Sequence, residues 1–308
     1  MDAIRHLVIA DEVRNALDTG TPVVAFESTV LTHGLPYPKS VELALRVEEI
    51  VRQEQCVPAT IGIIDGVIHV GMAETEVDRL AGDGNALKAS SFDLAYAIGA
   101  KKSAGTTVSG TLTIAERVGV KVFATGGIGG VHRGAEETFD ISHDLKTLAR
   151  SRVITVCAGA KAILDLPKTL EYLETEGVCV IGYKTKTLPA FYSRDSGLPL
   201  AYSADSFQEI ADVYIVREQL NLPGGILVVA PLPEEKELPF KRINSEIEKA
   251  LEAAAELGIR GKDVTPFLLA RLADTTKGRS VESNLALLEN NARVAAGIAR
   301  SIAKTMRS

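Results

Sequence analysis

Short apolar runs alternate with amphipathic stretches along nearly the whole chain, and this alternation constrains the fold more than any other feature of the sequence. Six runs are rich in β-branched residues and short enough to be buried strands: residues 22–27, 59–64, 121–126, 153–159, 178–183 and 224–231. Between them, segments such as 40–55, 203–222 and 243–258 carry apolar residues three and four positions apart, which indicates helices. Strands that alternate with helices predict a mainly parallel sheet with helices on its faces.

One pair of strands is expected to be antiparallel, which would make the sheet mixed. Asp65 and Gly66 separate the apolar runs IGII and VIHV, and a two-residue Asp-Gly connection is typical of a tight hairpin. The length of 308 residues could hold two average domains, but no low-complexity linker or charge block divides the chain. We therefore expect a single domain over residues 1–308, a three-layer α/β/α fold around a mixed, mainly parallel sheet.

The composition argues against several classes of function. The formal net charge of −6 would repel a nucleic-acid backbone, and no run of Lys and Arg interleaved with aromatic residues offsets it. Cys56, Cys157 and Cys179 are odd in number and widely spaced, so neither a disulfide framework nor a zinc site is indicated. Without a signal peptide or a long apolar run, the chain is expected to be cytoplasmic and to have no membrane partner. A small anion remains open as a ligand, because it needs only a few aimed donors.

The glycine-rich segment 124–142, ATGGIGGVHRGAEETFDIS, is the least ordinary part of the chain. Its four clustered glycines would let the backbone reach positive φ and approach a ligand closely, although a tight turn would explain them equally well. The dinucleotide fingerprint is not satisfied, because His132 stands where the third glycine should be. Asp140 is the kind of lone oxygen donor that a hydrated magnesium or manganese ion accepts, but an aspartate in a loop is more often structural.

Lys161 is a candidate nucleophile. It follows the apolar run VITVCAGA and precedes AILDL, which places it near a predicted helix start in a stretch without other charges. Desolvation and the positive end of a helix would both lower the pKa of its amine toward the range that a Schiff-base nucleophile needs. A lysine whose stem packs against apolar surface while its amine reaches solvent is the alternative.

Glu27 is a candidate proton donor, because it ends the buried run PVVAFE and the carboxyl ends of parallel strands are where open α/β folds bind ligands. A partly desolvated carboxyl has a raised pKa and can hold a proton at neutral pH. Capping of Ser28 or Thr29 would explain this glutamate as well. Ser142 stands at a predicted helix start, which suits either a phosphate or an ordinary N-cap.

Taken together, long segments of the chain resemble the pseudouridine-5'-phosphate glycosidase family, also called the indigoidine synthase A-like family. The resemblance runs from about residue 8 to 305 through FESTVLTHGLPYP, VPATIGIIDGVIHVG, GTTVSGT, FATGGIGGVHRGAEETFDIS, VCAGAKAILDLPKTLEYLET, GYKTKTLPAFY and GKDVTPFLLARL. Motifs so long and so many are highly specific. They favour the functional alternatives above over the structural ones.

The resemblance implies reversible hydrolysis of pseudouridine 5'-phosphate to ribose 5-phosphate and uracil, assisted by a divalent cation that is usually manganese. On the family's pattern Glu27 is the proton donor, Lys161 the nucleophile and Asp140 the metal ligand. The implied substrate contacts are Lys88, Val108, Ser142, His143 and Asp144, with His132 and Asn284 as further candidates for the base end. The family's members are often trimeric, so the resemblance also implies a homotrimer.

Two positions depart from the family's pattern. The family commonly has a small residue where His143 stands and basic residues near Ser91 and Phe92, so phosphate affinity or pocket shape could differ here. Two other readings stay open at this point: a related C-glycoside or indigoidine-pathway enzyme, and a non-catalytic protein that binds a sugar phosphate.

Overall fold

The computed structural model describes residues 6–259 and 264–307. Within them the chain forms the following strands: β1 (Leu7–Ile9), β2 (Val23–Phe26), β3 (Val57–Ile64), β4 (Val67–Val70), β5 (Leu87–Ala89), β6 (Ala104–Thr106), β7 (Val122–Ala124), β8 (Ile154–Cys157), β9 (Cys179–Tyr183), β10 (Tyr202–Ala204) and β11 (Ile226–Val229). All six predicted strand regions contain a strand. Residues 261–263 of the motif GKDVTPFLLARL lie outside the described residues.

The helices fill the connections between the strands. They are α1 (Asp11–Thr19), α2 (Lys39–Gln53), α3 (Glu74–Ala81), α4 (Leu94–Gly99), α5 (Val108–Val118), α6 (Ala135–Thr138), α7 (His143–Arg150), α8 (Leu166–Thr175), α9 (Phe207–Gln219), α10 (Phe240–Glu256), α11 (Val264–Thr275) and α12 (Arg279–Arg307). A short π-helix, η1 (Val30–Gly34), follows β2, and a 3₁₀ turn, η2 (Glu234–Lys236), precedes α10.

The strands form one mixed, mainly parallel sheet, as predicted. Its order is β1-β4-β3-β2-β7-β8-β11-β9-β10, and the branch β6-β5 leaves it at β3. Only the pairs that β3 makes with β4 and β6 are antiparallel among the described strands. Asp65 and Gly66 have φ values of 50° and 78° and close the β3–β4 hairpin, which confirms the expected two-residue turn.

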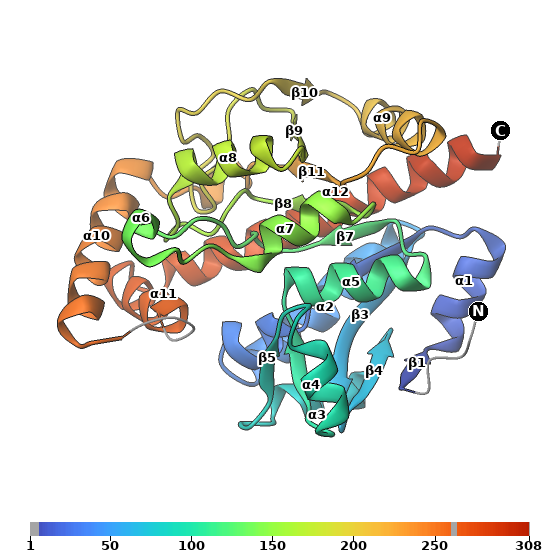
Figure 1. Cartoon of the computed structure of the whole chain (residues 1–308), viewed down its shortest axis with the longest axis horizontal. Coiled ribbons are helices and arrows are strands. Elements are labelled where there is room, and N and C mark those ends of the chain that lie inside the picture. Colours follow the sequence, from blue (N-terminus) through green and yellow to red (C-terminus); the bar gives the residue numbers. More distant parts are fainter. Residues whose placement is uncertain (1–5, 260–263, 308) are drawn as a thin grey trace.

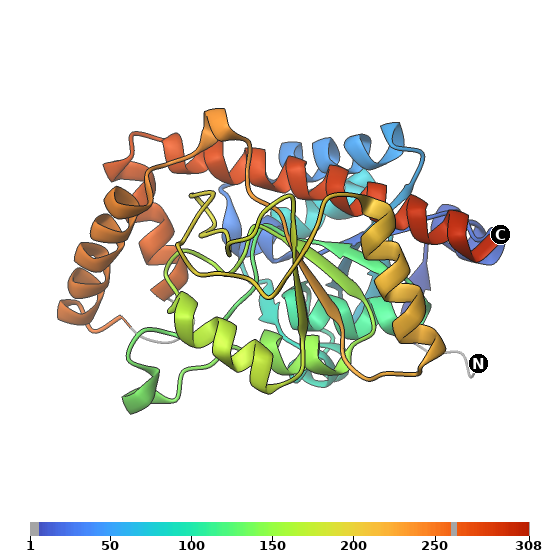
Figure 2. The same ribbon diagram turned by 90° about the horizontal axis from the view of Figure 1, so that it is seen from above.

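Helices cover both faces of the sheet (Figures 1 and 2). The long α12 and α2 lie along one face, and α5, α7 and α8 lie along the other. The pair α10 and α11 stands at one end of the molecule, beyond the sheet, and α12 leads from it across the strands. The predicted three-layer α/β/α arrangement is therefore confirmed.

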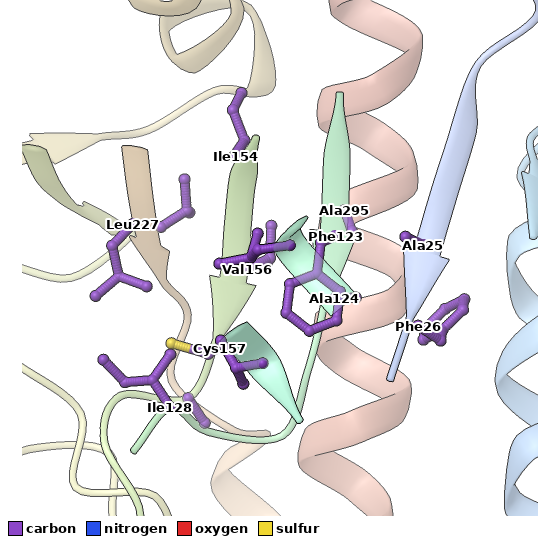
Figure 3. Close-up of a cluster of buried hydrophobic side chains, with 14 of the residues drawn as sticks. Ala25, Phe26, Phe123, Ala124, Ile128, Ile154, Val156, Cys157, Leu227 and Ala295 are labelled. Carbon is purple, nitrogen blue, oxygen red and sulfur yellow. The ribbon is translucent and has the colours of Figure 1, made fainter. Parts of the chain in front are cut away.

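The centre of the core is formed by the middle strands β2, β7, β8 and β11, whose buried side chains cover both faces of the sheet (Figure 3). The strand register places Phe123 and Leu227 on one face and Phe26 and Val156 on the other. All four strands are buried along their whole length, as continuous apolar runs predict for strands covered on both faces. Ala295 lets α12 approach the sheet closely. This rigid centre supports the strand ends that carry the candidate site.

None of the described helices combines the length and the apolar character needed to cross a membrane.

Candidate active site

Three parallel strands that are neighbours in the sheet end beside one another, and polar residues follow each of them. The order β2-β7-β8 places Glu27, which follows β2, next to Thr125, which follows β7. The loop after β8 carries Lys161. Because open α/β sheets bind ligands at the carboxyl ends of their strands, this edge is the candidate site.

Glu27 lies at the boundary of the protein interior. The residue is half-buried, and the Thr125 hydroxyl donates a hydrogen bond to its Oε1. Burial raises the pKa of the Glu27 carboxyl above its ordinary value of 4.5, while the charge of Lys161 and the hydrogen bond from Thr125 partly oppose the rise. Such a carboxyl keeps its proton to higher pH than an exposed glutamate, which is what a proton donor requires.

Lys161 is positioned by pairing between two loops. The Ile128 N–H donates to the Gly159 carbonyl at 3.2 Å, and the Lys161 N–H donates to the Ile128 carbonyl at 3.0 Å. Gly159 has a φ of +90°, and a Cβ there would lie 2.2 Å from the Pro189 carbonyl oxygen, so only glycine fits. The expected helix start at Lys161 is wrong, because α8 begins only at Leu166.

The clustered glycines at 126–130 serve close packing within the protein. None of them adopts a positive φ, so that part of the prediction is wrong. A Cβ at Gly127 would lie 2.7 Å from the Phe191 ring, and one at Gly129 would lie 2.2 Å from the Ser142 Oγ. Neighbouring side chains therefore press against this loop and fix its path beside Lys161.

Two pockets open at this edge of the sheet, and both have Lys88, Lys161 and Ile163 in their walls. We name them the Glu27 pocket and the Ser142 pocket, each after a residue that lines only that pocket. Lys88 comes from β5 and Lys161 from the loop after β8. A ligand bound across the two pockets would therefore have both lysines near its middle.

The Glu27 pocket has a largely apolar wall. Phe191, Tyr192 and Leu288 contribute to it, together with Leu272 from α11. The Phe191 and Tyr192 rings are perpendicular, with centroids 4.7 Å apart. Flat rings and aliphatic side chains of this kind suit a planar, weakly polar group.

A few polar side chains face this apolar wall. Asn284 of α12 and His33 of η1 line the Glu27 pocket along with Glu27 and Thr125. The Nδ1 atom of His33 lies 2.7 Å from the Thr32 hydroxyl. Asn284 therefore lines the same pocket as Glu27, the candidate proton donor. Sequence reasoning did not single out His33 or Thr125, although both fall within quoted motifs, FESTVLTHG and FATGG.

The Ser142 pocket is built around two helix starts. The Ser142 side chain is the N-cap of α7 and accepts a hydrogen bond from the Asp144 N–H at 3.3 Å. Asp144 is buried, and its two carboxylate oxygens accept from the Ser109 N–H and the Gly129 N–H, each at 2.9 Å. Asp144 therefore fixes the start of α5 and the glycine loop relative to α7.

Val108 lies at the first position of α5, and its side chain is buried in the core. Its neighbours Thr107 and Ser109 line the Ser142 pocket. Val108 itself lines neither pocket, so the structure brings its neighbours, and not Val108, to the wall of the Ser142 pocket.

The rim of the Ser142 pocket carries the two positions that depart from the family's pattern. The rings of Phe92 and His143 make an edge contact with centroids 5.7 Å apart. Both line the pocket, and Phe92 is 65% exposed.

Asp140 and His132 also line the Ser142 pocket, so His132 lies apart from Asn284. The His132 Nδ1 and the Asp140 Oδ2 are 3.9 Å apart. Burial lowers the pKa of His132, and the negative charge of Asp140 opposes this.

The donor set for a metal ion is small. Over residues 6–259 and 264–307, no group of three His, Cys, Asp or Glu side chains gathers to hold a metal ion. The exposed Asp140 carboxylate, on the rim of a pocket, fits an ion that keeps most of its water, as magnesium and manganese do. It does not fit a tetrahedral zinc site.

Comparison with known proteins identifies relatives over nearly the full length of the chain. The family model described as "Indigoidine synthase A like protein" matches residues 12–301. The "Pseudouridine-5'-phosphate glycosidase" of Solibacter usitatus is 53% identical over 294 residues, which cover 96% of this chain and 98% of the relative. The protein of the same name from Glaesserella parasuis serovar 5 is 50% identical over 294 residues, with coverage of 96% and 97%.

Solved structures agree with the sequence relatives. The prealnumycin C-glycosynthase AlnA, in complex with ribulose 5-phosphate, superposes with a TM-score of 0.92 at 37% identity, covering 99% of each chain. An indigoidine synthase A-like protein of Thermotoga maritima gives a TM-score of 0.90 at 37% identity, covering 98% of this chain and 99% of the other. The chain therefore belongs to the indigoidine synthase A-like family.

Proposed function

We propose that this protein is an enzyme that reversibly cleaves the C–C glycosidic bond of pseudouridine 5'-phosphate, giving ribose 5-phosphate and uracil. The observation that carries the proposal is the position of Lys161 in the shared wall of the two pockets. A nucleotide lying across Lys161 would have its phosphate among the hydroxyls around Ser142 and its base beside Glu27. The names of the relatives from Solibacter usitatus and Glaesserella parasuis support the same reaction.

The bond to be broken explains why a lysine is needed. An ordinary nucleoside releases its base through nitrogen, whereas pseudouridine joins C1' of the ribose to a carbon atom, which is a much poorer leaving group. Two carboxylates around an oxocarbenium ion, the usual glycosidase arrangement, would not suffice. In our proposal the neutral Lys161 amine attacks C1', the C1'–O4' bond breaks, and the ring oxygen takes up the proton that the newly bonded nitrogen loses. The nitrogen lone pair then forms an iminium as the C1'–C5 bond breaks.

Glu27 supplies the proton that this step consumes. As the bond breaks, C5 of the uracil takes the electron pair and must be protonated. Glu27 lies in the partly apolar pocket where the base would sit, and burial raises the pKa of its carboxyl. Water then hydrolyses the iminium, which frees Lys161 and gives the aldehyde of ribose 5-phosphate.

The Ser142 pocket holds the phosphate in this proposal. Lys88 lies between the pockets and supplies a positive charge, and Ser142 offers a hydroxyl at the start of α7. His143, which lines the same pocket, is a further contact for the phosphate in this proposal. Asp140 would hold a hydrated divalent cation, manganese in our proposal, which neutralises phosphate charge when bound. The proposal also includes a homotrimeric assembly and a cytoplasmic location.

A related C-glycoside enzyme is the second candidate. The similarity to the prealnumycin C-glycosynthase, whose complex contains ribulose 5-phosphate, favours a sugar phosphate but a different carbon acceptor. A protein that only binds sugar phosphates is disfavoured, because Glu27 and Lys161 interact electrostatically at a shared pocket.

The test is incubation of the protein with pseudouridine 5'-phosphate and manganese while free uracil is measured. We expect the wild-type protein to release uracil and Lys161→Ala to release none. Lys168→Ala is a matched control, since Lys168 is an exposed, ion-paired lysine of α8 outside both pockets. Absence of uracil with the wild-type protein would refute the proposed substrate, and slow uracil release from Lys161→Ala would refute the proposed nucleophile.

A further inference from the structure

A buried asparagine links the C-terminal helix to the candidate proton donor. Asn291 of α12 is fully buried, and its Nδ2 donates to the Thr125 carbonyl at 2.8 Å and to the Gly126 carbonyl at 3.4 Å. Thr125 in turn donates its hydroxyl hydrogen bond to Glu27. A continuous chain of contacts therefore runs from α12 through the end of β7 to Glu27.

The orientation of the Asn291 amide is fixed by this contact. Its Oδ1 atom is buried and has no hydrogen-bond partner among the described residues. Exchanging the amide nitrogen and oxygen would point an oxygen at two carbonyl oxygens, which is unfavourable. A buried polar atom without a partner is destabilising, so an apolar side chain would suit this position better unless the N–H donors are needed.

The Thr125–Gly126 segment has little freedom to move. The Thr125 N–H donates to the Val156 carbonyl at 3.0 Å, and the Gly126 carbonyl accepts from the Ala158 N–H at 3.0 Å. The segment is thus held between β8 on one side and Asn291 on the other. Thr125 itself is 1% exposed, so its hydroxyl has a fixed direction toward Glu27.

We propose that Asn291 and Thr125 are positioning residues for the reaction, acting together to hold the Glu27 carboxyl in the orientation from which it delivers its proton. The proposal rests on the proposed function, in which Glu27 is the acid. Neither residue needs to touch the reacting atoms. Their effect should appear in turnover and in the titration of Glu27, and much less in substrate binding.

The direction of the titration change follows from the contacts. The Thr125 hydroxyl stabilises the ionised carboxylate, so its removal should raise the pKa of Glu27 further. Glu27 would then keep its proton to higher pH, and the alkaline limb of the pH–rate profile would move to higher pH. The other groups that face Glu27 are unchanged by this substitution: Lys161 after β8, Lys88 of β5, Asp144 of α7 and His33 of η1.

The first experiment compares Thr125→Val with Thr125→Ser and Thr155→Val. Thr155 is a matched control, because it is fully buried on β8 and its hydroxyl makes no hydrogen bond to the described residues. We expect Thr125→Val to lower kcat about ten- to a hundredfold, with KM within about twofold of wild type. Thr125→Ser should restore most of the turnover, and Thr155→Val should change neither constant.

The titration of Glu27 can be measured without substrate. The infrared C=O stretch of its protonated carboxyl is identified by its loss in Glu27→Gln. We expect its midpoint to move to higher pH in Thr125→Val and to stay unchanged in Thr155→Val. An unchanged or lowered midpoint, or a kcat equal to that of Thr155→Val, would overturn the role of Thr125. Failure of the proposed function would instead appear as a wild-type protein that releases no uracil.

Asn291→Leu tests the second link, with Asn290→Leu as its control. Asn290 makes a similar hydrogen bond, to the Pro231 carbonyl at 3.2 Å, that does not lead to Glu27. We expect Asn291→Leu to lower kcat, and the double variant with Thr125→Val to be little worse than Thr125→Val alone, because both act through one carboxyl. If Asn291→Leu does not fold, Asn291→Ala removes the N–H pair without introducing new side-chain atoms. The role of Asn291 would be overturned if the effects of Asn291→Leu and Thr125→Val on kcat were fully additive, or if Asn291→Leu had the same kcat as Asn290→Leu.

Discussion

The Glu27 pocket and the Ser142 pocket meet at the same two lysines but offer different environments. Phe191, Tyr192 and Leu288 contribute to the wall of the first, and the carboxyl of Glu27 within it has a pKa raised by burial. The second is lined by hydroxyls and by Asp140 and Asp144, and one of its rim residues, Phe92, is largely exposed.

This difference assigns a separate task to each pocket. A desolvated wall makes the protonation state of Glu27 depend on its few neighbours, which suits proton transfer. A polar, solvent-accessible wall suits an anion that keeps part of its hydration. Changes in the Glu27 pocket should therefore act mainly on kcat, and changes in the Ser142 pocket mainly on KM. Substitutions in each pocket test that division.

The largest effect is expected at the boundary between the pockets. Lys161→Ala should show no measurable turnover, and Lys161→Arg should fail as well, because a guanidinium stays charged and cannot form an imine. Borohydride added during turnover should attach a reduced pentose phosphate to Lys161 of the wild-type protein, detected by peptide mass. An adduct found on Lys88 instead would move the nucleophile to the other shared lysine and contradict the assignment.

Glu27→Gln should have the next largest effect. The glutamine keeps the shape of the side chain but cannot deliver a proton, so kcat should fall by roughly two to four orders of magnitude with little change in substrate binding. In the wild-type protein, activity should fall as pH rises through the raised pKa of Glu27, because the acid is then ionised. Steady-state kinetics across the pH range provides both measurements.

The thermal stability of Glu27→Gln separates a catalytic from a structural role. Because the folded state raises the pKa of Glu27, the contribution of this carboxyl to stability is full below pH 4.5 and is lost as pH rises through the raised value. Glutamine carries no charge to desolvate. The variant should therefore be no less stable than the wild type at alkaline pH, and a marked loss of stability there would indicate a structural glutamate.

The sequence predicted the elements at the site better than their arrangement. Glu27 and Lys161 could be located because each follows a continuous apolar run, and such runs have the length and composition of buried strands. The strands β5 and β6 have three residues each, too few to show a periodicity, although β5 carries Lys88.

Long-range contacts explain the rest of what was missed. The hydrogen bond between Thr125 and Glu27 depends on β7 lying next to β2, and that strand order is not written in any local pattern. The bridges from Val131 to Ile141 and from His132 to Leu164 place His132 with Asp140 in the Ser142 pocket, a neighbourhood that no local pattern indicates. The clustered glycines indicated an unusual loop. The sequence did not show that glycine is needed there because neighbouring side chains pack closely against the loop, and not because the backbone adopts a positive φ.

Asp140→Ala should lower activity less than Glu27→Gln does, and the size of the loss should depend on the manganese concentration. Chelation should remove most of the activity, and manganese should restore it. Asp140→Ala should raise the manganese concentration needed for half-maximal activity at least about tenfold, the loss common for groups that support a metal site. Asp195→Ala is a control, since Asp195 lines neither pocket. Full activity of a demonstrably metal-free wild-type protein would rule out the cation.

The smallest effects are expected at the rim of the Ser142 pocket. Phe92→Ala removes the edge contact with His143, and an aromatic pair of this kind corresponds to about two- to tenfold in binding. We expect KM for pseudouridine 5'-phosphate to rise by the lower part of that range, because Phe92 is largely exposed, while kcat stays unchanged. His143→Ala should raise KM for the phosphorylated substrate more than KM for pseudouridine, if His143 contacts the phosphate. Tyr96→Ala is the matched control, as Tyr96 is equally exposed but lines neither pocket. A fall in kcat for Phe92→Ala without a change in KM would show that the two pockets do not divide binding and chemistry as proposed.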